Sequence, residues 1–382
     1  MPYPIHGLEA LTTPCLILDE ARMTRNIRRL ADKATALGVT LRPHLKTGKS
    51  IDVARRVLTD GSGPATVSTL AEAEVFADSG VHDILYAVGI TPQKLQRVLA
   101  LRERGCDLVI LVDSIAQARA VAAAAETTGK PIPALIEIDS DGHRGGLRAG
   151  DSELIEIGRL LHGSGAGLRG VMTHAGESYG VSGRAAHAKF AAEERDATVA
   201  AARTLRAAGL PCPVVSVGST PTAHAAEDLS GVTELRAGVY MFFDLVMAGI
   251  GVCDTDDIAL SVLTTVIGHQ RDRGWVLVDA GWMAMSRDRG TSAQAVDQGY
   301  GIVCNLEGRM YPDLIVQQAN QEHGIIALRP GSSQRLPDLP VGTRLRILPN
   351  HACATAAQHG SYHVIPADGS AQLRQWHRFG GW

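Results

Sequence analysis

The sequence predicts an α/β fold in which an N-terminal (β/α)8 barrel is followed by a C-terminal, mostly β domain. Two observations carry this prediction. From about residue 20 to 245, short apolar runs alternate with alanine-rich helical stretches, the order typical of parallel strands joined by right-handed helical crossovers. After Gly249 the long helical patterns stop, and short β-rich pieces with many Gly and Pro follow. Eight strand–helix units indicate a barrel, although the pattern alone also allows a doubly wound sheet.

The barrel elements follow from these apolar and helical runs, taken in order along the chain. The expected strands are Val39–Leu41, Ala65–Ser68, Ile84–Val88, Leu108–Val112, Ala134–Ile138, Leu168–Thr173, Val214–Val217 and Glu234–Arg236. Amphipathic, alanine-rich stretches between them predict helices. The clearest are Leu70–Asp78, Gln93–Arg104, Ser114–Glu126, Ser152–Leu161 and Arg184–Ala208.

The second domain is expected to be built from short strands in the C-terminal third of the chain. These are Ala259–Ile267, Trp275–Asp279, Gly324–Leu328 and Leu345–Leu348. The segment Pro14–Asp19 is also strand-like, and it is assigned to this second domain rather than to the barrel. The expected domains are therefore a barrel of residues 20–248 and a β-rich domain of residues 1–19 plus 249–382.

Composition limits the class of protein. The chain has 382 residues, of which 45% are hydrophobic and 20% charged, so a sizeable core is available and disorder is disfavoured. The net charge of −3 and the 4% of aromatic residues argue against a nucleic-acid binder. No apolar run is long enough to span a bilayer, and the N-terminus lacks the pattern of a signal peptide. The six scattered cysteines contain no CxxC pair, which indicates reduced thiols and a cytoplasmic protein.

Three basic residues alternate at the end of the first expected barrel strand. Arg42, His44 and Lys46 would share one face of that strand, because successive side chains of a strand point to opposite sides. Crowded cations and partial burial favour a neutral lysine amine, as a Schiff-base lysine requires. The alternative is an edge strand that carries solvated basic residues.

Two polar loops follow the fifth and sixth expected strands, at the barrel end where active sites lie. The first, Glu137–Gly146, contains Arg144, and the second, Thr173–Tyr179, contains His174 and Tyr179. The pattern alone favours the plainer interpretation, a glycine turn with a surface arginine and a histidine with a structural role.

The loops after the seventh and eighth expected strands are candidates for binding phosphate, as in many barrel enzymes. Gly218 allows close approach of the backbone, Ser219 and Thr220 offer donors, and a following helix would point its N-terminus at an anion. Gly238 and Tyr240, in the loop Ala237–Tyr240, complete this expected site.

His351 and Cys353 form a His-x-Cys pair in the C-terminal domain. In an extended segment both side chains face the same way and can share one metal ion. Imidazole and thiolate together favour zinc, and two protein ligands leave positions open for water and substrate. The alternative is a chance His-x-Cys.

Several of these motifs together resemble a known family. Thr13–Asp19 followed by Arg42–Thr47 resembles the opening of the alanine racemase-type enzymes that use pyridoxal 5'-phosphate (PLP). The narrower resemblance is to the D-serine dehydratase and D-threonine aldolase branch, with matching motifs from residue 13 to about 364. It implies an alanine racemase-like barrel that binds PLP, a C-terminal β domain and a homodimer.

The resemblance also implies roles for site residues. Lys46 is implied to bind PLP as a Schiff base, with His44 beside it. Arg144 is implied to face the pyridine nitrogen, where a cation weakens the ring as an electron sink. His174 and Tyr179 are implied to contact the ring or its 3-oxygen.

His351 and Cys353 are implied to bind a divalent metal, which could be Zn, Mn, Co, Ni or Mg. D-Serine dehydratases have His-x-Cys at this position, whereas the D-threonine aldolases tend toward His-x-Asp. This difference favours a dehydratase.

The expected function is a PLP- and metal-dependent dehydratase, an ammonia-lyase of D-β-hydroxy amino acids. The substrate expected first is D-threo-3-hydroxyaspartate, which would yield oxaloacetate and ammonia, and D-serine is a further candidate. Retro-aldol cleavage of D-threonine type, giving glycine and an aldehyde, remains an alternative. An amino-acid racemase and a non-catalytic PLP carrier are two others.

Overall fold

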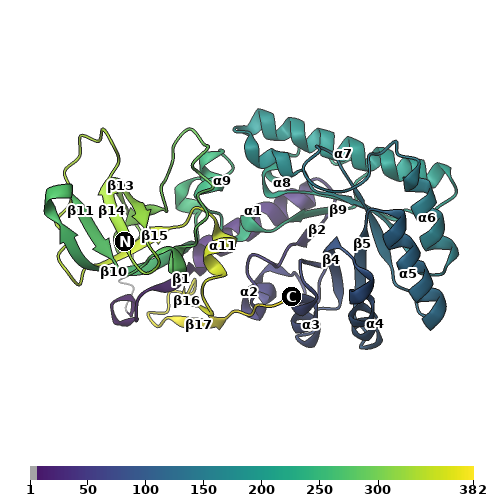
Figure 1. Ribbon diagram of the computed structural model, residues 1–382, viewed down its shortest axis with the longest axis horizontal. Coiled ribbons are helices and arrows are strands. Elements are labelled where there is room, and N and C mark those ends of the chain that lie inside the picture. Colours follow the sequence, from purple (N-terminus) through teal and green to yellow (C-terminus); the bar gives the residue numbers. More distant parts are fainter. Residues whose placement is uncertain (1–6) are drawn as a thin grey trace. The chain divides into compact units, whose positions relative to one another are not determined.

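A computed structural model describes residues 7–382, which form two compact units (Figure 1). The β unit contains residues up to Arg28 and Val239–Phe379, and the barrel unit contains Arg29–Gly238 and the last three residues. The division falls after Arg28 and Gly238, whereas the expected boundaries lay after residues 19 and 248; residues 1–6 lie outside the described chain. The first half of helix α1 (Glu20–Ala36) belongs to the β unit, because Asn26 Nδ2 donates to the Asp257 carbonyl at 2.8 Å.

The barrel unit contains the expected parallel strands, and the predicted fold class is confirmed. Within the described residues the sheet has eight strands in the order β2-β9-β8-β7-β6-β5-β4-β3. The two end strands meet through a bridge between His44 and Thr66, and the Leu45 N–H donates to the Thr66 carbonyl at 2.8 Å. The strands are β2 (Thr40–Pro43), β3 (Ala65–Val67), β4 (Asp83–Gly89), β5 (Asp107–Val112), β6 (Ala134–Ile138), β7 (Leu168–Thr173), β8 (Val214–Val217) and β9 (Glu234–Ala237).

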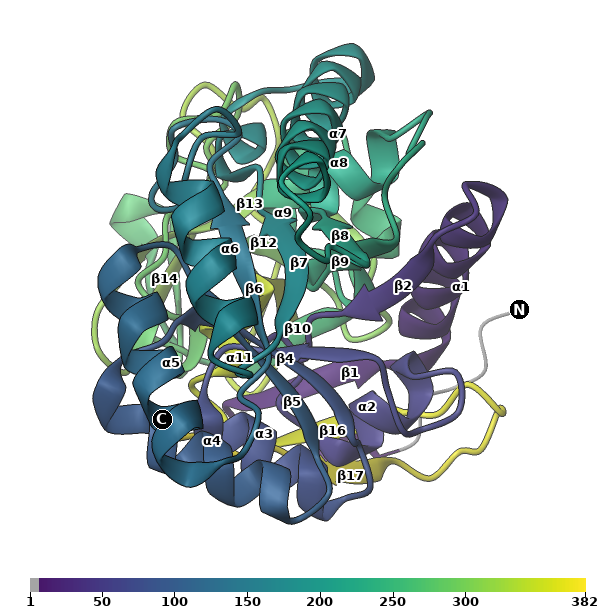
Figure 2. The same cartoon turned by 90° about the vertical axis from the view of Figure 1, so that its right-hand side faces the viewer.

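Helices cover the outside of this sheet, as Figure 2 shows for α3 to α7. Side-chain caps fix where two of them begin: Thr69 accepts the N–H of Glu72, and Ser114 accepts that of Gln117. The predicted helices are present within a few residues of their expected bounds. The barrel helices are α2 (Ile51–Val57), α3 (Leu70–Asp78), α4 (Leu95–Glu103), α5 (Ile115–Thr128), α6 (Glu153–Gly163), α7 (Arg184–Ala207) and α8 (Thr220–Ala225).

The barrel interior is packed with apolar side chains. Leu85, Leu111, Leu135 and Met172 come from consecutive strands of the sheet and form one buried cluster. A filled interior leaves the loops beyond the strand ends to carry chemistry, as in other barrels of this type.

The β unit is a mostly antiparallel sheet that closes on itself. Within the described residues its nine strands run β11-β14-β13-β12-β15-β10-β1-β16-β17, and β10 also pairs with β11. Strand β1 pairs with β10 and β16, so residues 15–19 lie in the sheet of this unit. The strands are β1 (Cys15–Asp19), β10 (Leu260–Gln270), β11 (Trp275–Val278), β12 (Ile302–Cys304), β13 (Met310–Ala319), β14 (Gly324–Leu328), β15 (Arg344–Leu348), β16 (Ser361–Ile365) and β17 (Arg374–His377).

Short helices connect the strands of the β unit. They are α9 (Leu245–Gly249), α10 (Trp282–Met285) and α11 (Ala352–Ala356). No disulfide joins any of the six cysteines, which all lie among residues 7–382. No helix among residues 7–382 is both long and apolar enough to cross a membrane.

We expect Gly170→Ala to destabilise the barrel. Gly170 has a positive φ of 139°, and a Cβ added there would lie 2.0 Å from the Val214 carbonyl oxygen on the neighbouring strand. The melting temperature should fall by about 3 °C or more. Differential scanning calorimetry of the full chain measures this.

Gly163→Ala is the matched control, because a Cβ at Gly163 meets nothing within 4 Å. Equal melting temperatures for wild type and the Gly170 variant would contradict the close approach of β7 and β8.

Candidate functional site

Lys46 lies in a turn just beyond the first barrel strand. Strand β2 ends at Pro43, His44 forms the bridge to Thr66, and the Lys49 N–H donates to the Leu45 carbonyl at 2.9 Å. The side chain of Lys46 is exposed rather than partly buried. The turn therefore presents the amine at the carboxyl end of the barrel strands.

Arg42 does not join His44 and Lys46, contrary to the prediction that the three share one face. It is buried, and its guanidinium donates to Glu234 at 2.6 Å and to Asp83 at 2.7 Å. The reason is that the strand ends before His44, so strand alternation does not extend to Lys46.

His44 is surrounded by positive charge. Loss of solvation, followed by the charges of Lys46 and Arg236, lowers the pKa of His44 well below its usual value. His174 and Arg144 act in the same direction more weakly. The structure thus brings together four of the predicted residues, and His44 is neutral among them at neutral pH.

His174 is held by the loop that follows β8. Its Nδ1 lies 3.0 Å from the Gly218 carbonyl oxygen, so Nδ1 carries the proton and Nε2 keeps a lone pair. Burial lowers the pKa of His174 to about 3. The Tyr179 ring lies 6.2 Å from the His174 ring, and the Tyr179 hydroxyl accepts the Thr220 N–H at 3.5 Å.

Gly218 and its two successors form a tight, polar corner. Gly218 has a φ of 135°, and a Cβ there would lie 2.0 Å from the Arg236 carbonyl oxygen, so only glycine fits. Ser219 caps α8 by accepting the Thr222 N–H. The hydroxyl of Thr220 is buried and has no hydrogen-bond partner among residues 7–382. An unpartnered buried hydroxyl at such a corner suits an anionic ligand.

Gly238 packs against the turn that carries Lys46. A Cβ at Gly238 would lie 3.1 Å from both the His44 carbonyl oxygen and the Thr47 hydroxyl. Tyr240 belongs to the β unit. It is fully buried, burial raises its pKa, and its hydroxyl has no partner in the described part of the chain.

Arg144 lies in the loop after β6 with about half of its side chain exposed. Its nearest acidic partner is Glu137, with an Nη2 to Oε1 distance of 3.9 Å. The positive charge of Arg144 contributes to lowering the pKa of both His44 and His174. The loop thus adds a cation to the group around His44.

Glu194 is a residue of the site that sequence reasoning missed. This buried carboxylate on α7 accepts the N–H of Ala175 at 3.0 Å and the N–H of Gly218 at 2.9 Å, both at Oε1. Burial raises its pKa, while the hydrogen bonds from Thr222 and the two amides oppose that rise. One side chain therefore ties the loop after β7 to the loop after β8. Its partners are backbone amides of distant loops, so no local motif signals it.

His351 and Cys353 are adjacent in the β unit, but not on a strand as predicted. His351 is the extended N-cap of α11, and Cys353 lies in the first turn of that helix. The two side chains are hydrogen-bonded, and His351 Nδ1 lies 2.6 Å from Asp288 Oδ2. Burial lowers the pKa of His351, but the hydrogen bonds to Asp288 and Cys353 outweigh it and raise the pKa to about 11.

Two buried side chains hold the His-x-Cys segment in place. Asp244 accepts the Met247 N–H at 3.0 Å and the Ala352 N–H at 2.9 Å. Asn350 donates to the Gly299 carbonyl at 2.6 Å. The backbone between the two candidate ligands is thereby fixed.

The donor chemistry at this pair suits a metal with open positions. A pKa of about 11 leaves both ring nitrogens of His351 protonated, so a metal would have to displace the Nε2 proton. The imidazole, held at Nδ1 by a carboxylate, would then have the usual arrangement of a metal-binding histidine. Among residues 7–382 there is no group of three or more His, Cys, Asp or Glu side chains placed to hold a metal ion. A metal held by His351 and Cys353 would therefore keep positions for water and substrate.

The comparison with known families agrees with this division of the chain. The family "Alanine racemase, N-terminal domain" matches residues 18–246, and a serine dehydratase domain family matches residues 259–365. The two matches cover the strands of the barrel and most of those of the β unit.

Curated relatives match nearly the whole chain. D-threo-3-hydroxyaspartate dehydratase of Delftia sp. is 56% identical over 98% of this chain and 99% of its own length. D-serine dehydratase of Dictyostelium discoideum is 30% identical, and the match covers 94% of each chain.

Solved structures show the same relationship. The Delftia enzyme superposes with a TM-score of 0.95 over 98% of this chain and 99% of its own. Structures of a D-threo-3-hydroxyaspartate dehydratase are also known for an H351A mutant and for a C353A mutant in the metal-free form. Alanine racemase of Clostridium difficile, 14% identical with a TM-score of 0.69 over 96% of this chain and 99% of its own, shares the fold. The chain therefore belongs to the family that joins an alanine racemase N-terminal domain to a serine dehydratase domain.

Proposed function

We propose that this protein is a PLP- and metal-dependent dehydratase of D-β-hydroxy amino acids, with D-threo-3-hydroxyaspartate as its main substrate. The observation that carries the proposal is the His351–Cys353 pair with Asp288 on the imidazole. The relative of 56% identity, a D-threo-3-hydroxyaspartate dehydratase, supports the choice of substrate. The C353A mutant of a D-threo-3-hydroxyaspartate dehydratase, solved in a metal-free form, supports a metal in the mechanism.

The residues of the barrel unit fit PLP. Lys46 would hold the cofactor covalently, and the unpartnered Thr220 hydroxyl, with Gly218 and Ser219, would receive its phosphate. Gly238 and Tyr240 are proposed as further contacts of the phosphate. His44, His174 and Tyr179 are proposed to contact the ring, with Arg144 at the pyridine nitrogen.

The residues of the β unit fit a divalent metal. His351 and Cys353 would be its protein ligands, and Zn, Mn, Co, Ni or Mg are the candidate ions. When bound, such an ion supplies Lewis-acid chemistry at the β-hydroxyl, which matters because hydroxide is a poor leaving group.

The protein's own residues then divide the work of the reaction. PLP, when bound, supplies an electron sink for the Cα carbanion. The amine of Lys46, when it is no longer joined to the cofactor, would take the Cα proton as general base. The hydrogen bond from His174 Nδ1 to the Gly218 carbonyl fixes the ring, so that Nε2 can only accept a proton or a hydrogen bond. The overall reaction converts D-threo-3-hydroxyaspartate into oxaloacetate and ammonia.

Product analysis tests the proposal. The holoenzyme with PLP and a divalent metal should release ammonia and a 2-oxo acid from D-threo-3-hydroxyaspartate, and more slowly from D-serine. A chelator or Cys353→Ala should abolish turnover while PLP stays bound to Lys46, because the metal acts on the leaving group only. Lys46→Ala should lose both turnover and the cofactor's absorbance band.

Other products would point to other chemistry. Glycine with an aldehyde would identify an aldolase and overturn the dehydratase proposal. Racemised substrate with full activity in the chelator would identify a racemase. Inertness of wild type and the Lys46 variant toward every substrate would indicate a non-catalytic PLP carrier.

Glu194→Ala is expected to weaken PLP binding by about tenfold or more, because the loops that it ties together would separate. Glu194→Gln should restore much of the affinity, since an amide oxygen can accept the same two N–H groups. Titration of the apoprotein with PLP, followed by absorbance, measures both. Wild-type affinity in the Ala variant would show that Glu194 does not position the site.

Asp288→Ala is expected to weaken metal binding by about 10–100-fold, because it frees the His351 ring to rotate. Isothermal titration of metal into the PLP-loaded protein measures this, with cofactor absorbance unchanged. Glu307→Ala is the matched control, since Glu307 forms an exposed ion pair with Arg309 in the same unit. Equal metal affinity for both variants and wild type would exclude the positioning role.

A further inference from the structure

Lys49, three residues after Lys46, has a strained backbone conformation. Its φ of 42° lies in the left-handed region, where the Cβ of an L-residue crowds a neighbouring carbonyl oxygen. A strained residue persists only where other contacts hold it, and such residues cluster at functional sites. The contacts of Lys49 therefore indicate what keeps this part of the chain in place. Among residues 7–382, four residues other than glycine have a positive φ: Lys49, Phe243, Ser286 and Asp313.

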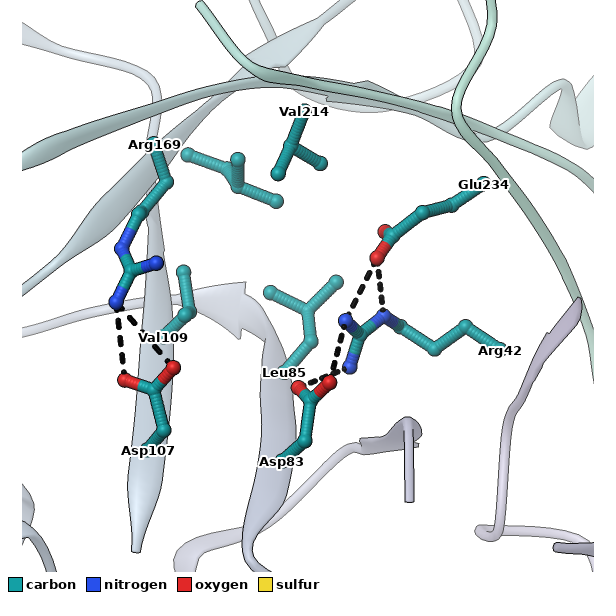
Figure 3. A pocket seen from close by; sticks show the side chains of 9 residues that line it. Arg42, Asp83, Leu85, Asp107, Val109, Arg169, Val214 and Glu234 are labelled. Atoms are coloured by element: carbon teal, nitrogen blue, oxygen red, sulfur yellow. Dashed lines mark hydrogen bonds and ion pairs between the residues drawn. The ribbon is translucent and has the colours of Figure 1, made fainter. Parts of the chain in front are cut away.

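Strand β2, which leads to Lys46, is held on both sides. The guanidinium of Arg42 donates to Glu234 of β9 and to Asp83 of β4 (Figure 3). It also donates to the Ala65 carbonyl of β3 at 3.3 Å. The strand is therefore fixed before Lys46 is reached, and the direction of the Lys46 side chain depends on the turn that follows.

This turn is closed around Lys46. The Lys49 N–H donates to the Leu45 carbonyl at 2.9 Å, so the chain from Leu45 to Lys49 forms a single turn. The Leu45 N–H donates to the Thr66 carbonyl at 2.8 Å, which attaches the start of the turn to strand β3. Lys46 is exposed, whereas the residues on either side of it are buried. A change in the turn would therefore change where the Lys46 amine points.

An ion pair attaches the end of the turn. Lys49 Nζ lies 3.1 Å from Glu72 Oε1, and only 1% of the Glu72 side chain is exposed. The same oxygen accepts the Ser68 hydroxyl at 2.7 Å, and Oε2 accepts the Ser68 N–H at 3.0 Å. A buried carboxylate is stable only with such partners, and removing its cation leaves a buried charge without compensation. The ion pair is therefore a strong attachment rather than an exposed surface contact.

Both attachments of the turn belong to one stretch of the barrel, strand β3 and helix α3. Thr66 lies in β3, and Glu72 lies in the first turn of α3, where its N–H donates to the Thr69 hydroxyl at 3.0 Å. Ser68, between them, is held by the Glu72 carboxylate. Two attachments to one fixed stretch determine the orientation of the turn as well as its position.

We propose that Lys49, held by Glu72, is a positioning residue that sets the direction of the Lys46 side chain for attachment of the cofactor. The inference rests on the proposed role of Lys46. In the attachment, the Lys46 amine adds to the aldehyde carbon of PLP and water leaves, so the amine must approach that carbon in a defined orientation. Lys49 acts on this step through the turn, because its own ammonium is engaged by Glu72. The ion pair stabilises a turn that the backbone alone disfavours.

Two ligands separate this positioning role from a general effect on stability. Pyridoxine 5'-phosphate has the phosphate and ring of PLP but an alcohol in place of the aldehyde, so it cannot attach to Lys46. Isothermal titration of the full-length apoprotein measures both affinities, and absorbance reports the attachment. Lys49→Met should weaken PLP binding by about tenfold or more, because the Lys46 amine is no longer held in one direction. The affinity of this variant for pyridoxine 5'-phosphate should stay within about twofold of wild type.

Further variants test the ion pair itself. Lys49→Arg should recover most of the PLP affinity, because a guanidinium can also pair with Glu72. Glu72→Gln should match Lys49→Met, and the double variant should bind PLP no more weakly than either single variant, since both remove the same interaction. Lys189→Met is the matched control, because Lys189 forms an exposed ion pair with Glu193 on α7.

Lys49→Gly provides a second route if Lys49→Met folds poorly. Glycine relieves the backbone strain while it removes the ion pair, so this variant should fold and show the same selective loss of PLP affinity. Wild-type PLP affinity in Lys49→Met or Lys49→Gly would overturn the inference. Equal loss of affinity for both ligands would also overturn it, because that result indicates a purely structural ion pair. Absence of the attached cofactor's absorbance band in wild type would instead overturn the proposed role of Lys46, and this inference with it.

Discussion

The buried carboxylate of Glu194 is the interaction on which the catalytic end of the barrel depends. A carboxylate taken out of water is stable only when donors replace its hydration, and here backbone amides of two different loops do so. One of these amides belongs to Gly218, whose carbonyl in turn holds the His174 ring. A single helix residue thus fixes the corner proposed for phosphate and the histidine proposed for the ring. The ends of the strands alone would not fix the positions of these two loops relative to each other.

The sequence predicted much of the barrel and less of the β unit, for a physical reason. Ala134–Ile138 and Leu168–Thr173 occur with the bounds expected, because strands buried on both faces are mostly apolar and differ clearly from the polar segments beside them. Strand β13 was missed, since Pro312 and Asp313 interrupt its pattern and Asp313 has a φ of 56°. Strand β16 is short and mixes polar with apolar residues, so it carries no distinct signal either.

The sequence likewise predicted only part of the candidate sites. The spacing of His351 and Cys353 was enough to predict that they are neighbours. The predicted extended backbone was wrong, because the segment starts a helix instead of continuing a strand. Asp288 was not predicted as a partner, since it is 63 residues from His351 in the sequence and only the fold brings them to 2.6 Å. Sequence motifs point to residues that are expected to contact a ligand. The side chains that hold those residues in position come from distant parts of the sequence, so only the tertiary structure identifies them.

The way in which the barrel closes has a consequence for its motions. Between β2 and β3 the contact is a single bridge at His44 and Thr66, where other neighbouring strands share a ladder of several pairs. The guanidinium of Arg42 spans this seam by donating to the Ala65 carbonyl at 3.3 Å. Local opening costs less where fewer backbone hydrogen bonds must break. The barrel should therefore open most easily on this side. Lys46, the residue proposed to hold the cofactor, is two residues from the bridge, so the proposed attachment point lies beside the weakest part of the wall.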